Sequence, residues 1–254
     1  MQFYILGSGT HFPDPKRRSA GYLLRDGKDL TLFDFGYGTL LRLVELKVKY
    51  QDIQHIFFTH LHKDHFFDLL PFLTTLENQV EQWRLQPRTL TLYGPKGFMR
   101  TLKKVFAGLG KKSYEGIAIK YHELSRSRVR IGRVSVLSHP VRHYPNLKCI
   151  AYRIQKGRRA LAYTGDLDYD EKIIPFVRGV RTLVIECGLP NELKHKGHLT
   201  PRECGMIATK AKVKRVVLTH RFPPCDRVDV VGQCREEYSG VVQLAKDRAI
   251  ITFY

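Results

Sequence analysis

Short runs that are apolar, or in which apolar residues alternate with polar ones, recur along the whole chain, and this pattern predicts β-strands. Most of the runs are bounded by Gly, Pro or Asp, which favour turns. We expect strands at residues 3–7, 20–25, 30–35, 55–59, 89–93, 117–124, 128–137, 149–155, 159–164, 182–186, 215–219 and 249–253.

Between these runs, apolar residues recur at the three- and four-residue spacing of helices that bury one face. We expect helices at residues 38–46, 65–83, 97–109, 170–177, 200–211 and 233–245. The helix at 200–211 also has a start signal, because Thr200 suits the cap position and Pro201 suits the first helical position. Many strands with helices interspersed predict a layered α/β fold.

The chain has 254 residues, of which 43% are hydrophobic, so it is long enough to bury one large core. Since we find no linker, repeat or low-complexity stretch, we expect a single domain over residues 1–254. The first residues lack the basic start, apolar stretch and cleavage site of a signal peptide. No apolar run reaches the roughly 18 residues that span a bilayer, so we expect a cytoplasmic protein that does not bind membranes.

The five cysteines are odd in number and include no Cys-x-x-Cys pair. This usage argues against the disulfide framework of a secreted protein and against a structural zinc site built from thiolates. We therefore expect free thiols at Cys149, Cys187, Cys204, Cys225 and Cys234.

Positive charge is the least ordinary property of the composition. Lys and Arg number 43 against 24 Asp and Glu, which gives a formal net charge of +19. The cations are spread along the chain, and a field of this sign favours polyanions such as nucleic acid or phosphorylated substrates. A generally basic, solvated surface would give the same composition, so charge alone leaves both interpretations open.

Chemistry-bearing side chains crowd together at residues 59–65, where the sequence Thr-His-Leu-His-Lys-Asp-His follows an apolar run. Because side chains alternate along an extended segment, His60 and His62 point to the same side, within reach of one cation. Asp64 and His65 follow where the chain turns into a helix, and they can face a second cation. Imidazole nitrogen with carboxylate oxygen suits zinc, manganese or iron, and the lack of thiolate argues against a purely structural site.

Two cations held at this segment need further ligands from other parts of the chain. His143, Asp166 and His220 stand at predicted strand ends or in the adjoining loops. Functional residues are commonly carried on loops above a rigid scaffold, which supports all three as candidate ligands.

The order of these motifs resembles the metallo-β-lactamase superfamily: His-x-His-x-Asp-His at 60–65, a later His, a Gly-Asp pair and a final Thr-His. The resemblance covers nearly all of the chain and implies a four-layered αβ/βα sandwich with a binuclear site between its two sheets. By that resemblance, the first metal is held by His60, His62 and His143, the second by Asp64, His65 and His220, and Asp166 bridges both.

A finer resemblance, to the ribonuclease Z and phosphodiesterase branch, rests on Gly-Ser-Gly-Thr at 7–10, Leu-Phe-Asp-Phe-Gly at 32–36 and Gly-His-Leu-Thr at 197–200. In that branch a histidine matching His198 assists the leaving group or meets the scissile phosphate; the alternative is a helix-start residue without a chemical role. Asp34 is expected to be a buried carboxylate that supports the site. Gly7 and Gly9 are expected in a tight turn, because no helix start follows them.

The sequence departs from ribonuclease Z in three places. Asp68 stands where those sequences usually carry Gly, and Arg-Phe-Pro-Pro at 221–224 replaces a Phe-Ser-x-Arg-Tyr-like run. The long flexible arm that grips transfer RNA has no counterpart, because residues 89–137 show ordinary strand and helix patterns. Transfer-RNA processing is therefore an expectation that the sequence does not secure.

The resemblance implies a hydrolase with two divalent metal ions, zinc as the first choice and manganese or iron as alternatives, that attacks a phosphate ester with a metal-bound hydroxide. Asp64, Asp166 and His198 are the expected catalytic residues, with Asp166 orienting the nucleophile and His198 serving the leaving group. The expected substrate is a phosphodiester, RNA among the candidates, and ribonuclease Z-like enzymes are often homodimers.

Two alternatives remain open. The same centre could hydrolyse a thioester, lactone or sulfate ester, although the net charge and the run around His198 favour phosphate. A catalytically silent member that binds nucleic acid is the other alternative, although silent members tend to lose ligands that this chain keeps. A flavin-linked diiron oxidoreductase is disfavoured, because His62 stands where those proteins prefer Glu.

Overall fold

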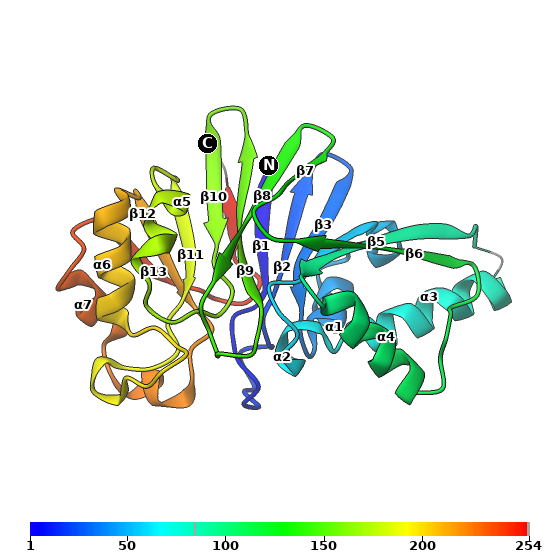
Figure 1. Cartoon of the computed structure of the whole chain (residues 1–254), viewed down its shortest axis with the longest axis horizontal. Coiled ribbons are helices and arrows are strands. Elements are labelled where there is room, and N and C mark those ends of the chain that lie inside the picture. Colours follow the sequence, from blue (N-terminus) through cyan, green and yellow to red (C-terminus); the bar gives the residue numbers. More distant parts are fainter. Residues whose placement is uncertain (84, 253–254) are drawn as a thin grey trace.

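Two seven-stranded sheets that face each other form the centre of the molecule in the computed structural model, which describes residues 1–83 and 85–252 (Figure 1). The first sheet has the strand order β14-β1-β2-β3-β4-β5-β6, so the last strand of the chain pairs with the first. Its strands are β1 (Gln2–Gly7), β2 (Gly21–Asp26), β3 (Asp29–Phe35), β4 (His55–Phe57), β5 (Arg88–Pro95), β6 (Ile117–Leu124) and β14 (Ile250–Thr252).

The second sheet has the strand order β13-β12-β11-β10-β9-β8-β7 and contains most of the C-terminal half. One half of this sheet is an antiparallel meander, and the other half, from β10 to β13, is parallel. Its strands are β7 (Arg128–Ile131), β8 (Val134–Val141), β9 (Cys149–Lys156), β10 (Arg159–Tyr163), β11 (Thr182–Glu186), β12 (Arg215–Thr219) and β13 (Val241–Leu244).

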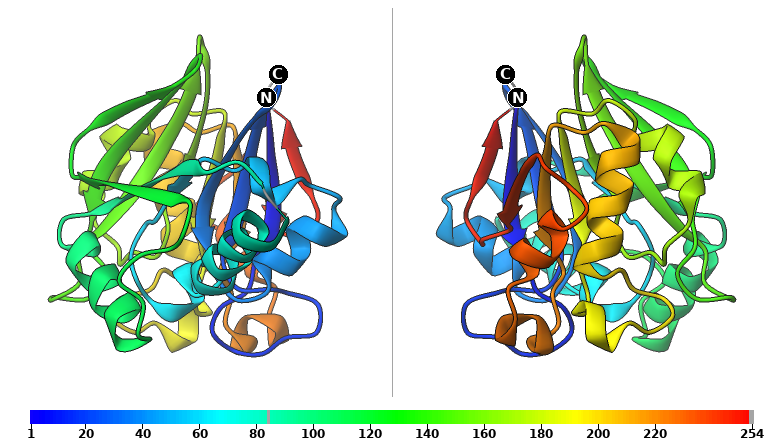
Figure 2. Two further views of the ribbon diagram at one scale, coloured as in Figure 1. Left: turned by 90° about the vertical axis from the view of Figure 1, so that its right-hand side faces the viewer. Right: turned by 90° about the vertical axis from the view of Figure 1, so that its left-hand side faces the viewer.

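Helices cover the outer face of each sheet and complete a four-layered molecule (Figure 2). Buried apolar clusters fill the three interfaces: the first sheet against its helices, the second sheet against its helices, and the two sheets against each other. The αβ/βα sandwich expected from the sequence is thereby confirmed. The helices of the first sheet are α1 (Thr39–Glu45), α2 (Lys63–Phe66), α3 (Leu69–Trp83) and α4 (Phe98–Gly108), and those of the second are α5 (Ile174–Val177), α6 (Pro201–Ala211) and α7 (Val230–Arg235).

The interface between the sheets is rich in stacked aromatic side chains. The rings of Phe57 and Tyr93 lie 4.2 Å apart and nearly parallel, and those of Phe33 and Phe57 lie 5.1 Å apart. All three side chains are buried. Each aromatic pair of this kind stabilises the fold by about 0.5–1.5 kcal/mol beyond the effect of the area that it buries. The stacked rings therefore help to hold the neighbouring strands β3, β4 and β5 together.

Parallel pairing brings the functional loops to one edge of the sandwich. In the first sheet β3, β4 and β5 are parallel, and in the second β10, β11 and β12 are parallel. The carboxyl ends of parallel strands meet at the same edge of a sheet, where open α/β sheets bind their ligands. In Figure 1 this is the lower edge, where α2 lies.

Three predicted elements differ from the structure. The run at 128–137 is a hairpin rather than one strand, because Gly132 adopts a φ of 53° and turns the chain between β7 and β8. The helix expected at 233–245 ends at Arg235, and the apolar residues after Gly240 form β13 beside β12. The helix expected at 65–83 is divided between Phe66 and Leu69 into α2 and α3. The other predicted elements are present, some with the predicted ends and some with shifted ends, and residue 253 of the last strand lies outside the described residues.

Three smaller expectations can also be compared with the structure. All five cysteines are buried free thiols, as expected. Within the part of the chain that the structure describes, no helix has the length and apolarity of a membrane span. A Cβ at Gly7 would lie 1.9 Å from the carbonyl oxygen of Ser19, so glycine here serves close packing of backbone on backbone.

Candidate metal centre

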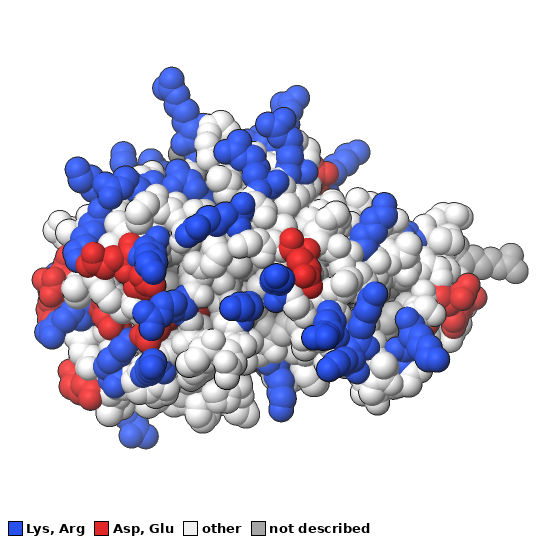
Figure 3. Space-filling model, in the orientation of Figure 1, with Lys and Arg blue, Asp and Glu red and all other residues white. Residues whose placement is uncertain are grey.

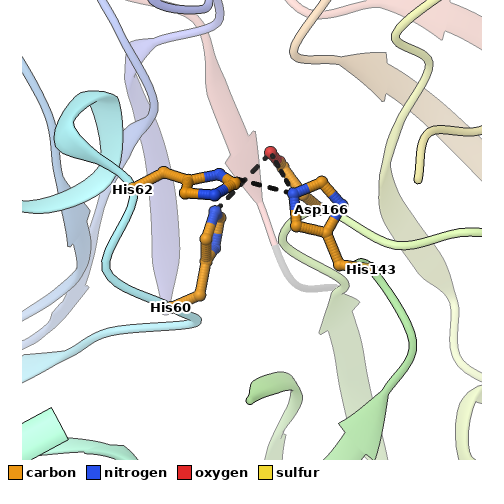
Figure 4. Close-up of side chains that lie close together, drawn as sticks. All are labelled: His60, His62, His143 and Asp166. Carbon is orange, nitrogen blue, oxygen red and sulfur yellow. Dashed lines mark hydrogen bonds and ion pairs between the residues drawn. The ribbon is translucent and has the colours of Figure 1, made fainter. Parts of the chain in front are cut away.

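All the candidate ligands from the sequence meet at the edge where the strands end. The histidines and aspartate of residues 60–65 follow β4, and they approach from the first sheet. His143 follows β8, Asp166 follows β10 and His220 follows β12, so these three approach from the second sheet. Figure 4 shows His60, His62, His143 and Asp166 pointing toward one another across this seam. The structure thus brings together side chains up to 160 positions apart in the sequence.

The first group of candidate ligands is His60, His62, His143 and Asp166, whose nitrogen and oxygen atoms all lie within 4.8 Å of one another. Nε2 of His60 lies 3.7 Å and Nε2 of His143 lies 3.9 Å from Oδ2 of Asp166. Nε2 of His143 also lies 3.4 Å from Nδ1 of His62. Three imidazole nitrogens and one carboxylate therefore surround a common point.

The second group is Asp64, His65 and His220, whose ligand atoms also lie within 4.8 Å of one another. Nε2 of His220 lies 3.2 Å from Oδ2 of Asp64 and 3.2 Å from Nε2 of His65. Asp166 lies between the two groups, since its Oδ1 is 3.4 Å from Nε2 of His65 and its Oδ2 is 3.5 Å from Nε2 of His220. A single carboxylate is thus within reach of both groups.

The hydrogen bonds within this cluster leave some of its buried polar atoms unpaired, and a bound cation would pair them. Nε2 of His60 and Oδ1 of Asp166 are buried and have no hydrogen-bond partner among the described residues. Buried polar atoms in native proteins are nearly always paired, so atoms left over at the centre of a cluster indicate a missing partner. Imidazole nitrogen and carboxylate oxygen are donors that suit zinc, manganese and iron. The residues present therefore fit the metal that the sequence predicts.

Burial and charge put His60, His143 and Asp166 in the protonation states that metals bind. Burial lowers the pKa of His143 to about 4 and holds the pKa of His60 well below its usual range, so both rings are neutral near pH 7. Burial raises the pKa of Asp166, but the imidazoles of His220, His65 and His60 outweigh it and hold the pKa of that carboxyl well below its usual value. Neutral imidazole and ionised carboxylate are the forms that coordinate a cation. For His65, burial lowers the pKa, but the neighbouring carboxylates outweigh it and hold the pKa well above its usual range.

Asp34 orients two of the histidines from behind. Its Oδ2 accepts hydrogen bonds from Nδ1 of His65 at 2.8 Å and from the hydroxyl of Thr59 at 2.8 Å. Thr59 in turn lies 3.1 Å from Nδ1 of His60, and its hydroxyl oxygen accepts that proton. Both rings therefore carry hydrogen on Nδ1 and present Nε2 to the cluster. Asp34 is the buried supporting carboxylate that the sequence predicts, and such outer partners fix ring orientation in metal sites.

The backbone is strained where it delivers these side chains. Asp34 has a φ of 54° and His220 a φ of 52°, in the left-handed region that costs a non-glycine residue about 1–2 kcal/mol. Gly165 has a φ of 58°, and a Cβ there would lie 2.5 Å from Cβ of Thr59. Strain of this kind clusters at functional sites, because the surrounding fold holds the backbone in place.

His198 lies beside the cluster and is held by a carboxylate that the sequence reasoning missed. Its Nδ1 donates to the carboxylate of Glu186, with distances of 3.1 and 3.2 Å to the two oxygens. Burial lowers the pKa of His198, but Glu186 outweighs it and raises the pKa to about 9. The ring lies 4.8 Å from that of His143 and 6.0 Å from that of His220. Glu186 is the last residue of the strand β11, and this position alone does not distinguish it from an ordinary polar strand end.

A family model supports this view of the fold. The model for the beta-lactamase superfamily domain matches residues 31–221, three quarters of the chain, and the matched range contains every candidate ligand. The chain belongs to the metallo-β-lactamase superfamily. The resemblance drawn from the motifs is thereby confirmed.

Superfamily relatives match this chain over nearly its full length. An uncharacterized protein of Mycobacterium tuberculosis is 29% identical over 250 residues, which are 95% of this chain and 88% of that protein. Ribonuclease Z of Mycobacterium bovis is 25% identical over 272 residues, covering 97% of this chain and 96% of the enzyme. The probable metallo-hydrolase YhfI of Bacillus subtilis is 27% identical over 252 residues, covering 97% of both proteins.

Solved structures of the superfamily show the same fold. The crystal structure of YhfI has a TM-score of 0.84 at 24% identity and covers 98% of both chains. The short form of human tRNase Z has a TM-score of 0.79 at 23% identity and covers 100% of both chains. A diphosphatase of the PhnP family has a TM-score of 0.77 at 20% identity and covers 100% of this chain and 98% of its own.

The centre opens to solvent through a mouth of about 760 Å³ whose rim is aromatic. Phe12, Tyr37 and Tyr144 stand on this rim with exposed fractions of 47%, 38% and 38%. Phe222 joins them and packs edge-on against the ring of His198 at 4.9 Å. The rim thus offers flat apolar faces to whatever substrate enters here.

Asp68, a departure from ribonuclease Z sequences, has a structural role. Its Oδ2 accepts a hydrogen bond from the backbone N–H of Leu40 at 2.7 Å, in the first turn of α1. The residue before that helix, Gly38, makes no side-chain cap of its own. Asp68 therefore caps α1 from 28 residues away.

Proposed function

We propose that this protein is a phosphodiesterase of the ribonuclease Z-like type that works with two divalent metal ions, zinc being the first choice. One observation carries the proposal: two groups of nitrogen and oxygen ligands share Asp166, and His198 faces the same cavity beside them. A structural metal site has no need of a shared carboxylate or of an adjoining histidine held by Glu186.

The assignment of ligands follows the two groups. His60, His62 and His143 would hold one cation, Asp64, His65 and His220 would hold the other, and Asp166 would contact both. When bound, the pair of cations supplies Lewis-acid polarisation of the phosphoryl oxygens and of water. Asp34 and Thr59 keep His65 and His60 in the tautomer that can bind.

The remaining steps belong to side chains of this chain. Asp64 and Asp166 present carboxylate oxygens to the cavity, where they accept hydrogen bonds from the attacking water and orient it. His198 donates from Nδ1 to Glu186, so its Nε2 is free to face the substrate. A proton at Nε2 passes to the departing oxygen, which makes His198 the general acid.

Phosphate is favoured over other esters for two reasons. The net charge of +19 attracts anionic substrates. Curated relatives that match nearly the whole chain bear the name ribonuclease Z, and a solved neighbour is named a diphosphatase. RNA is therefore the first macromolecular substrate to test, including an unprocessed transfer-RNA precursor.

The test uses purified protein loaded with zinc or manganese. Its substrates are bis(4-nitrophenyl) phosphate, a thioester and an unprocessed transfer-RNA precursor, and His60→Ala is assayed alongside. We expect phosphodiester cleavage that the substitution abolishes. Thioester turnover that depends on His60, without phosphodiester cleavage under either metal, would overturn the proposal in favour of another ester.

A second variant separates the general acid from the ligands. We expect His198→Ala to lower kcat about 10²- to 10⁴-fold while the metal content stays that of the parent protein. Loss of bound metal in this variant would instead assign His198 as a ligand.

A further inference from the structure

A second cavity, which we call the lateral groove, lies beside the candidate metal centre. It has a volume of about 510 Å³ and lies between the loop after β5, the end of β6 and the segment from Pro140 to Ile150. His143 and Tyr144 form its wall on the side of the metal centre, and Tyr144 also lines the mouth. The groove is therefore the next compartment that a chain-like substrate meets after it leaves the centre.

Four cationic side chains line the lateral groove: Lys96, Arg142, Lys148 and Lys196. In the described residues none of the four has an ion-pair partner. The acidic residue at its edge, Asp168, already pairs with Lys194 at 2.7 Å. The positive charge of the groove is thus left for an anion from solution.

The wall between these cations is apolar. Leu124, Val141 and Ile150 are among the residues that line it, and the exposed ring of Tyr144 closes the end nearest the metal centre. That ring is supported from behind, since a Cβ at Gly197 would lie 2.9 Å from it. A supported aromatic face next to cations is the arrangement that binds the bases and phosphates of single-stranded nucleic acid.

We propose that the lateral groove binds the nucleotide that adjoins the scissile phosphodiester, with its phosphate among the four cations and its base against Tyr144 and the apolar wall. This inference rests on the proposed function, because it names the substrate of the same centre as a nucleotide chain. The volume lies within the roughly 300–1,000 Å³ of cavities that bind small ligands. On the face shown in Figure 3, acidic side chains gather mainly over α6 and α7, whereas Lys and Arg predominate over the middle and right.

The experiment compares binding and turnover in Lys96→Ala/Lys148→Ala and in a control of equal charge, Lys28→Ala/Lys214→Ala. Lys28 and Lys214 are exposed and precede β3 and β12, so they lie at the strand ends opposite the metal centre. The binding probe is a fluorescein-labelled tetranucleotide with phosphorothioate linkages, which keep the charge and resist hydrolysis. Its anisotropy is titrated with metal-loaded protein over a range of sodium chloride concentrations.

For the groove variant we expect the Kd to rise about tenfold. Its salt dependence, the slope of log K on log salt, should shrink by about 1.4, at about 0.7 for each phosphate contact on a single strand. The control variant should keep the parental Kd and slope. Equal behaviour of the two double variants would overturn the groove assignment, since only a local contact distinguishes them.

Turnover separates this inference from the proposed function. Cleavage of bis(4-nitrophenyl) phosphate, which has no adjoining nucleotide, tests the metal centre alone, and its absence would defeat the proposed function whatever the tetranucleotide does. With that cleavage present, the ratio of kcat/KM for an unmodified tetranucleotide to kcat/KM for the small diester should fall in the groove variant and stay constant in the control. An unchanged ratio would overturn the inference and leave the proposed function standing.

Discussion

Substitution of Asp34 by Asn tests whether a buried carboxylate sets the tautomers of the metal ligands. The side chain of Asp34 has no exposed surface, and its two oxygens accept four hydrogen bonds. Oδ1 accepts from the N–H of Thr59 at 2.7 Å, and Oδ2 accepts from His65, from Tyr163 at 2.6 Å and from the hydroxyl of Thr59. Asn offers one oxygen and one NH₂ group, so in either orientation a donor faces a donor.

The magnitude depends on which position the NH₂ group takes. Hydroxyls can rotate away from it, but the ring of His65 cannot, because its Nε2 is directed at His220 at 3.2 Å. With NH₂ facing Nδ1, His65 keeps its proton on Nε2, the atom that must bind the metal. Loss of such an outer partner typically lowers metal affinity 10- to 100-fold, which is about 1.4–2.8 kcal/mol. The lost charged hydrogen bond should lower the free energy of unfolding by about 1.5–3 kcal/mol as well.

The assay measures zinc affinity by competition with a chromogenic chelator and follows thermal unfolding with and without metal. Tyr163→Phe is the matched control, since it removes one donor to Asp34 but leaves the carboxylate facing His65. We expect parental zinc affinity in the control and weakened affinity in Asp34→Asn. Parental zinc affinity in Asp34→Asn would refute the tautomer reasoning, whatever happens to stability.

Three further substitutions separate chemistry from stability. Glu186→Gln keeps an acceptor for His198 but removes its charge, so kcat on a phosphodiester should fall about 10²-fold with unchanged metal content; steady-state kinetics and metal analysis check both, and loss of metal would contradict it. Asp68→Ala removes the cap of α1 and should lower the free energy of unfolding by about 1 kcal/mol in a urea titration. An unchanged free energy of unfolding would show that the cap does not stabilise the protein. Gly165→Ala should be more destabilising than Gly27→Ala in the same titration, because the new Cβ clashes at the first position and enters open space at the second. Both carry the backbone strain of a positive φ, about 1–2 kcal/mol, so equal losses would mean that the clash is relieved.

Short apolar or alternating runs located the strands of both sheets. Strands covered on both faces are buried at nearly every position, as β3 and β11 are, and such strands tend to read as continuous apolar runs. The hairpin of β7 and β8 was missed although its signal was present: the apolar positions change phase at Gly132. The strand β13 was mistaken for helix because its four residues are too few to establish a period. Its pairing with β12, Val216 opposite Val242, is a tertiary contact that overrides local preference.

The candidate ligands could be predicted because each follows an apolar strand, and the edge of the sheet then brings them together. Glu186 could not be distinguished in this way, since it ends its strand as an ordinary polar residue. Its role becomes visible only in the structure, where it accepts a hydrogen bond from His198. The lateral groove was equally inaccessible, because Lys96, Arg142 and Lys196 come from three separate segments. The spacing of these residues along the chain does not show that the fold brings them to one groove.

The position of the metal centre at the seam between the sheets has a consequence for the life of the protein in the cell. Residues 60–65 approach from one half of the sandwich, and His143, Asp166 and His220 approach from the other. A cation bound there would therefore connect the two halves of the sandwich. At a free concentration 100 times its Kd, it would stabilise the folded chain by about 2.7 kcal/mol. Metal starvation would then increase the unfolded fraction that proteases degrade, so the metal supply would control the abundance of the protein as well as its activity.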